Sequence, residues 1–166
     1  MLIQNGSGEM KYIELTQNKF AIVDDEDFES LNKFRWNFHI CGYASRSVWS
    51  KDKKKYVVLL MHREILNANE NEFVDHKNFN RLDNRKENIR ICTKLQNNVN
   101  MCICTRNKTG YKGVTIHKPT GKIRASINKQ GKTIHIGYFK TLKGAAKAYN
   151  EYATRLFGNF AYLNKI

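Results

Sequence analysis

The sequence predicts an α+β protein. β-Hairpins lead into a strand–loop–strand–helix centre, and a three-stranded antiparallel sheet packed on one helix follows. Two observations support this. Residues 74–100 are crowded with Asn, Asp and Arg around two short apolar runs, and strict apolar–polar alternation begins at residue 111. The 166 residues suit one domain or two small ones.

Positive charge is concentrated in the second part of the chain. The net charge is +14; residues 101–166 hold 13 basic residues and one acidic residue, whereas the first hundred carry only +2. This division predicts a module over 10–100, a linker over 101–110 and a module over 111–166 that faces a polyanion. Nucleic acid is the favoured polyanion, and charge that serves only solubility is the alternative.

Other classes fit the composition less well. No stretch is apolar and long enough for a membrane span or a signal peptide, so we expect a cytoplasmic protein that does not bind membranes. We expect the first nine residues to form a flexible leader. The cysteines lack a C-x2-C pair, which argues against structural zinc and predicts reduced thiols. They are Cys41, Cys92, Cys102 and Cys104.

The first module begins with hairpins. Residues 11–23 predict a hairpin that turns at residues 17–18, and residues 24–33 predict a short helix that begins with four acids. A metal site at these acids is the less favoured alternative. Two strand-like runs follow, over 36–49 and 55–61, and a basic turn separates them. A helical patch then begins at His62, which either supports the site or is simply a packed histidine.

The centre of the chain predicts a strand, a long loop, a second strand and a helix. Residues 73–74 form the first strand and carry Asp75 and His76 outward, and residues 88–92 form the second. Thr93 and Gln96 have the spacing of a capping box, so a helix should begin near residue 94 and present Asn97 in its first turns.

The second module alternates regularly. Residues 111–118, 122–128 and 132–139 predict three strands joined by tight turns. Thr141 then caps a helix whose apolar stripe is rich in alanine and which ends at Gly158. The stripe should cover the apolar face of the sheet, including Val114 and Ile116, and leave the other face polar and basic.

Three polar residues of the centre suggest phosphodiester hydrolysis. If the strands pair and the helix crosses them, Asn97 approaches Asp75, and their oxygens suit Mg²⁺ rather than zinc. A neutral His76 could take a proton from water. Because Asp75 and His76 are consecutive, both reach one phosphate only if the strand bends or the site wraps around it. The alternative is an Asn-rich loop held by hydrogen bonds.

These residues resemble the HNH (ββα-metal) endonucleases, most closely the phage and intron-encoded branch. The matching segments are VDHKN, LDNRKENIR and TKLQNNVN, with Met61-His62-Arg63 upstream. The resemblance implies His76 as general base, Asp75 and Asn97 as metal ligands, and Asn88 as a structural residue of the loop. Asn97 stands where many members have His, which argues for Mg²⁺ or Mn²⁺.

The second module resembles the AP2 DNA-binding domain, through YKGV at 111–114, IGYF at 136–139, AAKAYN at 145–150 and Leu163-Asn164. The resemblance implies that the sheet binds double-stranded DNA in the major groove. Arg124 lies on the same face by alternation, and an ordinary solvated face is the alternative. The residues expected to face DNA are Lys112, Thr115, His117, Arg124, Ser126, Asn128, Thr133 and His135. We expect phosphate contacts from Lys118, Lys122, Lys129 and Lys132.

Together the two resemblances predict a metal-dependent homing endonuclease that nicks one strand as a monomer, with a dimer as the alternative. Phosphate contacts from Arg46, Lys51 and Lys53 to Lys55 would add affinity. The branch implies a gene carried by a phage or mobile element in a bacterial host. Two other functions are weighed against this one. They are a DNA-binding regulator with a silent nuclease site, and a non-specific defence nuclease.

Overall fold

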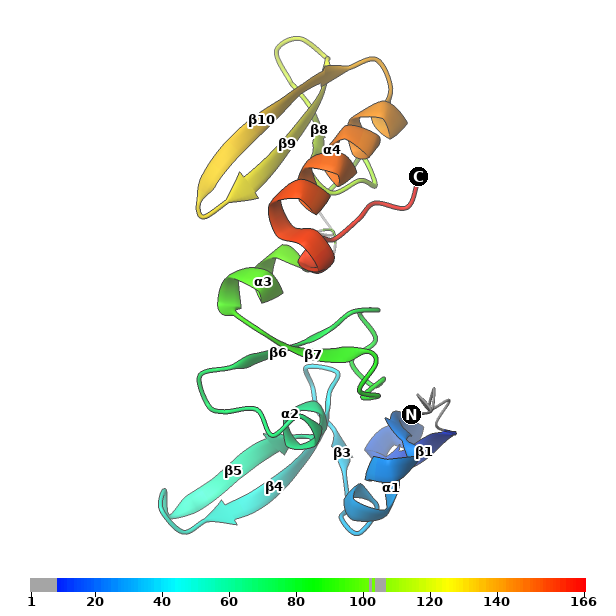
Figure 1. Ribbon diagram of the computed structural model, residues 1–166, viewed down its shortest axis with the longest axis vertical. Helices are drawn as coiled ribbons and strands as arrows, with labels where there is room; N and C mark the ends of the chain where they lie inside the picture. The colour runs from blue at the N-terminus through cyan, green and yellow to red at the C-terminus, as the bar shows by residue number, and fades with distance from the viewer. Residues whose placement is uncertain (1–8, 102, 104–106) are drawn as a thin grey trace, which may run out of the picture. The chain divides into compact units, whose positions relative to one another are not determined.

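The computed structural model describes residues 9–101, 103 and 107–166. The chain divides into two compact units, Met1–Cys92 and Thr93–Ile166, whose elements are labelled in Figure 1. The expected leader, apart from Glu9, lies outside the described residues, as do Cys102 and Cys104 of the expected linker. None of the helices in the described part of the chain has the length and apolar character needed to cross a membrane.

The first unit opens with the predicted hairpin. β1 (Met10–Leu15) pairs antiparallel with β2 (Lys19–Asp24), and a short 3-10 turn, Thr16–Asn18, joins them. Gln17 and Asn18 have φ angles of 64° and 52°, the left-handed conformation that a tight reversal needs. α1 (Asp25–Leu31) follows with three acids in its first turn, as predicted.

The next sheet has the strand order β3-β4-β5. β3 (Asn37–Phe38), β4 (Ala44–Ser50) and β5 (Lys55–Leu60) are antiparallel, and α2 (Met61–Ile65) follows β5 directly. The prediction of one strand over 36–49 is wrong. The chain turns at residues 39–42, where Gly42 has φ 82° and its N–H donates to the His39 carbonyl at 2.7 Å.

The centre forms a two-stranded ribbon of β6 (Phe73–His76) and β7 (Ile89–Cys92). The loop between them is attached to β2. The Ile22 N–H donates to the Leu82 carbonyl at 2.7 Å, and the Asn84 N–H donates to the Ile22 carbonyl at 2.8 Å. β1, β2, α1 and α2 contribute to one buried core, so this attachment fixes the loop against the packed part of the unit. The core residues are Ile13, Leu15, Ala21, Val23, Leu31, Trp36, Ala44 and Met61.

The second unit begins with α3 (Lys94–Val99), whose predicted capping box is present. The Thr93 hydroxyl accepts from the Gln96 N–H at 3.3 Å, and the Gln96 side-chain oxygen accepts from the Thr93 N–H at 2.8 Å. At the other end of the helix, Lys112 Nζ donates to the carbonyls of Val99 and Met101, both at 2.6 Å. Both ends of this short helix therefore have hydrogen-bond partners.

The predicted sheet and helix complete the second unit. β8 (Val114–Ile116), β9 (Ile123–Lys129) and β10 (Lys132–Phe139) form an antiparallel sheet of order β10-β9-β8. α4 (Leu142–Phe157) packs on it and is followed by a 3-10 turn, Gly158–Phe160 (Figure 1). Val114 is fully buried, but Ile116 is 56% exposed, so its predicted burial is wrong. Ile116 ends the edge strand β8 and does not join the core that α4 covers.

A β-bulge in β10 changes which side chains reach the polar face of the sheet. His135 lies opposite Ser126 and Gly137 opposite Ala125, so Ile136 is an extra residue in the ladder. Beyond the bulge, Tyr138 lies opposite Arg124. Tyr138 therefore shares the polar face with His135, which simple alternation along β10 does not predict.

Candidate active site

The β6–β7 ribbon places Asp75 and His76 on opposite faces. The register is regular, with Asp75 opposite Arg90 and His76 opposite Ile89. Asp75 Oδ2 accepts hydrogen bonds from Arg90 Nε at 3.0 Å and from Nη2 at 2.7 Å. Both Asp75 and His76 are buried. No bulge interrupts the register between them, so the site must wrap around the strand if both residues act on one phosphate.

His76 lies in a cluster of rings from three separate segments of the first unit. Its ring centroid is 5.0 Å from that of His62, at the start of α2, and 5.9 Å from that of Tyr43, just before β4. The Tyr43 and His62 centroids are 4.9 Å apart. Tyr43 was not predicted as a site residue, because it reaches His76 only through the turn at residues 39–42.

Asn84 fixes the orientation of the His76 ring. Its side-chain oxygen lies 3.3 Å from His76 Nε2, while its amide nitrogen donates to the Leu82 carbonyl at 3.2 Å. Because the Asn84 oxygen can only accept, this pairing needs a proton on His76 Nε2. His76 Nδ1 is then the nitrogen that can take up a proton when the ring is neutral. Asn84 is fully buried and was also missed in the sequence.

Both histidines are held neutral. Burial lowers the pKa of His76, although hydrogen bonding to Asn84 and the charges of Asp75 and Asp83 act in the opposite direction. Burial, His76 and Arg63 lower the pKa of His62 to about 3. His62 Nδ1 is buried and has no hydrogen-bond partner in the described part of the chain. A general base must be neutral before it accepts a proton, so the environment of His76 suits that role.

Asn88 and Asp83 hold the loop between the two strands. The Asn88 amide donates to the Asp83 carbonyl at 2.7 Å, and its side-chain oxygen accepts from the Asn78 N–H at 3.0 Å. These are the backbone hydrogen bonds that the expected structural role of Asn88 requires. Asp83 accepts from Arg85 Nε and Nη2, each at 2.8 Å, and these bonds lower its pKa. Asp83 was not singled out in the sequence, although it stands in the LDNR segment.

The predicted metal ligands lie in different units. Asp75 belongs to the first unit and Asn97 to α3 of the second, so their pairing around a metal stays a prediction. The donor set fits a hard cation, because a carboxylate and an amide supply only oxygen. Cys92 does not add a soft ligand readily, since burial and the charge of Asp75 raise the pKa of its thiol to about 11. Arg90 already gives Asp75 a cationic partner.

The acids at the start of α1 form a second oxygen cluster. Asp24, Glu26 and Asp27 bring ligand oxygens within 4.8 Å of one another. Lys86 Nζ lies 2.6 Å from Glu26 and 3.2 Å from Asp27. A lysine thus supplies the positive charge here, in line with the expectation that these acids start a helix.

Most residues expected to face DNA lie together on the polar face of the second sheet. Arg124, Ser126 and Asn128 alternate along β9, and each has a partner from the predicted set on a neighbouring strand. Arg124 lies opposite Thr115, Ser126 opposite His135, and Asn128 opposite Thr133. Tyr138 is the additional member, with ring centroids 5.8 Å from His117 and 4.9 Å from His135. Lys122 is exposed beside this face.

Three basic residues expected at DNA have partners within the chain. The ammonium group of Lys112 binds the carbonyls at the end of α3, and its contact with DNA stays a prediction. Arg46 forms a two-pronged contact with Glu64, at 2.8 and 3.2 Å, and its guanidinium lies 3.8 Å from the centre of the Phe34 ring. Lys53 forms an exposed ion pair with Glu70 at 2.7 Å. An exposed pair is weak, so Lys53 can exchange partners more easily than the other two.

Comparisons with known proteins define the class. A model of the HNH endonuclease family matches residues 68–99, which include the ribbon, its loop and α3. A protein of Acanthamoeba polyphaga mimivirus, described as an uncharacterized HNH endonuclease, is 30% identical over 148 residues. These residues cover 89% of this chain and 75% of the viral protein. No solved structure matches the chain significantly.

The chain therefore belongs to the HNH endonuclease family. Membership supports a nuclease that acts on DNA, and HNH nucleases generally use divalent metal ions.

Proposed function

We propose that the protein is a metal-dependent DNA endonuclease of the homing type that nicks one strand. The observation that carries the proposal is His76. Its buried ring is held by Asn84 and two neighbouring aromatic rings, in the segment that matches the family. Holding the ring in one tautomer and keeping it neutral prepares a general base, which a packing histidine does not need.

His76 takes a proton from water at Nδ1 as the water oxygen attacks phosphorus. The new P–O bond forms as the bond to the departing sugar oxygen breaks. Asp75 and Asn97 would hold a divalent cation, Mg²⁺ or Mn²⁺. When bound, this ion stabilises charge on the phosphate and the departing oxygen. Asn88 keeps the loop in place, and His62 supports the His76 ring through their edge contact.

The second unit would hold the duplex. Its sheet presents one polar, basic face while α4 covers the other, as an AP2-like module that binds the major groove requires. Arg124, Ser126, Asn128 and Thr133 would face base edges, with Thr115, His117, His135 and Tyr138 around them. The lysines at 118, 122, 129 and 132 would contact phosphates. One such site in each chain predicts that a monomer makes a nick.

Relaxation of supercoiled plasmid tests the nuclease proposal. We expect relaxation to need Mg²⁺ or Mn²⁺. The His76→Ala variant should lower the cleavage rate roughly 100- to 10,000-fold at saturating DNA, because only proton transfer is lost. DNA affinity, measured without metal, should stay near the wild-type value. Binding without cleavage, across several metals and DNA substrates, would reject the nuclease function.

One observation favours a DNA-binding regulator with a silent site as the second candidate. Arg90 places two donors on Asp75, which a protein without catalytic metal could use to neutralise this carboxylate. Metal-dependent shifts of the Asp75 and Asn97 signals in nuclear magnetic resonance spectra would argue against the silent site. Mapping cuts along a long random DNA substrate would then separate one preferred site from the general degradation expected of a defence nuclease.

A further inference from the structure

The β4–β5 hairpin carries an exposed apolar surface. Trp49 and Tyr56 are cross-strand partners with ring centroids 5.3 Å apart, and they are 56% and 71% exposed. Val58, two residues beyond Tyr56 and on the same face, is 55% exposed. We call Trp49, Tyr56 and Val58 the aromatic face. Folding alone would bury such side chains, so their grouping in the open indicates a binding surface.

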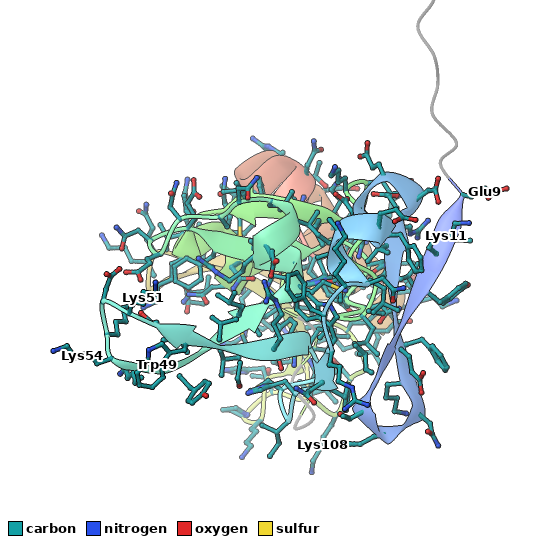
Figure 2. The ribbon with its side chains drawn as sticks, turned by 90° about the horizontal axis from the view of Figure 1, so that it is seen from below. Glu9, Lys11, Trp49, Lys51, Lys54 and Lys108 are labelled. Carbon is teal, nitrogen blue, oxygen red and sulfur yellow. The ribbon has the colours of Figure 1, made fainter. Side chains whose placement is uncertain are left out.

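The aromatic face ends at a basic turn. Residues 51–55 contain four lysines and one acid, Asp52. Lys53 is paired with Glu70, but no acid of the described chain lies within ion-pair distance of Lys51, Lys54 or Lys55. Figure 2 shows Trp49, Lys51 and Lys54 together at the end of the hairpin. A partner for this end of the hairpin must therefore combine negative charge with apolar contacts.

We propose that the aromatic face of the β4–β5 hairpin contacts duplex DNA, with the hairpin in the major groove. This inference rests on the proposed function, in which DNA is the substrate. The major groove admits a two-stranded β-ribbon and offers apolar contacts at thymine methyl groups, while phosphates line its edges. Lysines at the turn match those phosphates. A second copy of the chain fits less well, because it would bring two positively charged turns together.

Chain connectivity places this contact near the candidate site. β5 ends at Leu60 and α2 begins at Met61, and the His62 ring then lies 5.0 Å from that of His76. Six strand residues span roughly 20 Å. The turn of the hairpin therefore lies within roughly 20 Å of α2, which corresponds to at most about six steps along a DNA strand at about 3.4 Å per step.

Tryptophan fluorescence of the full-length protein tests the contact without cleavage. The chain has two tryptophans, and Trp36 is only 3% exposed, so acrylamide quenches mainly Trp49. The probe is a mixed-sequence DNA duplex, added in EDTA until anisotropy of a labelled copy shows saturation. We expect the quenching constant to fall at least about twofold, because a groove contact covers a side chain that is half exposed in the free protein.

Three distinguishable outcomes overturn the inference. If the duplex binds but leaves the quenching constant unchanged, the hairpin contact is wrong while the nuclease proposal stands. If no duplex binds at all, both fail. If raising protein concentration without DNA gives the same protection, and sedimentation shows a dimer, the aromatic face is a self-association surface instead.

Matched variants give a second measurement. Trp49→Ala should weaken duplex binding about tenfold without changing its salt dependence, because the lost contact is apolar. Lys51→Gln combined with Lys54→Gln should instead lower the slope of log affinity against log salt by about two. Tyr12→Ala removes a tyrosine that is 57% exposed on β1 and should change neither quantity. Trp49→Phe should restore most of the affinity; equal losses in Trp49→Ala and Tyr12→Ala would overturn the proposal.

Discussion

His62 and His76 meet edge to face in the first unit, and burial lowers the pKa of both. Neutral rings can stack in this way, whereas two imidazolium ions would repel each other. The contact therefore ties the chemistry of the candidate base to the packing around it. It also makes the unit sensitive to acid.

Acid sensitivity follows from the pKa of His62, which is about 3 in the folded protein and near 6.5 when the chain is unfolded. Between these values the unfolded chain binds a proton that the folded chain does not. The stabilisation is complete above pH 6.5 and is lost as the pH falls toward 3, at up to about 1.4 kcal/mol per pH unit. Urea unfolding at several pH values should show this decline.

The His62→Phe variant is the control for this prediction. Phenylalanine keeps a ring beside His76 and removes both the titration and the unpaired buried Nδ1. The free energy of unfolding should then fall less steeply between neutral pH and about pH 4. Parallel declines in the wild-type protein and the variant would place the acid sensitivity elsewhere.

The sequence singled out only part of the cluster around His76, because it missed Asp83 and Asn84 inside a matching segment and Tyr43 outside every motif. His76, Asp75 and Asn88 stand in the matching segments. Tyr43 is 33 positions before His76 along the chain and touches it only because of the turn that separates β3 from β4. No motif in the sequence around Tyr43 identifies it as a neighbour of His76, because the two residues meet only in the folded chain.

At the scale of elements, Gly113 determines how closely the second sheet and α4 pack. It has φ 74°, and a Cβ atom here would overlap the Tyr149 ring and lie 2.6 Å from the Ser126 carbonyl oxygen. We expect Gly113→Ala to destabilise the second unit by roughly 3 kcal/mol or more, from the clash together with the left-handed backbone. Thermal and urea unfolding measure the effect.

Gly121 is the matched control. Its φ is 67°, and a Cβ atom there would meet nothing within 4 Å. Gly121→Ala should therefore cost only the backbone term, about 1 kcal/mol. Similar losses for the two variants would show that the backbone conformation, and not the approach of Tyr149, makes glycine necessary at position 113.

The elements themselves were largely predictable, because alternation and capping are local. Thr93 with Gln96 and Thr141 with Gly144 both cap helices as expected. The failures occur where the backbone departs from regularity. The turn at residues 39–42 divides a strand-like run, and the bulge at Ile136 brings Tyr138 onto the polar face. Such irregularities depend on pairing with a neighbouring strand, which local sequence does not specify.

At the scale of the whole molecule, the two units differ clearly in net charge. Positive charge dominates the second unit, which has exposed lysines at the strand ends and turns of the sheet (118, 122, 129 and 132) and on α4 (143 and 147). Overall charge would attract DNA through either surface. The proposed function requires that the sheet face dominates.

A pair of four-lysine variants separates these possibilities. Changing the exposed lysines at 118, 122, 129 and 132 to glutamine should lower the slope of log affinity against log salt by about 3 to 4, because each lost phosphate contact removes about 0.9. The same change at 140, 143, 147 and 165, which are also exposed, alters the net charge equally. It should change the slope by less than about 1, because charges away from the phosphates displace few counterions. Fluorescence anisotropy across a salt series measures both slopes, and equal decreases would mean that general charge, and not the sheet face, binds the duplex.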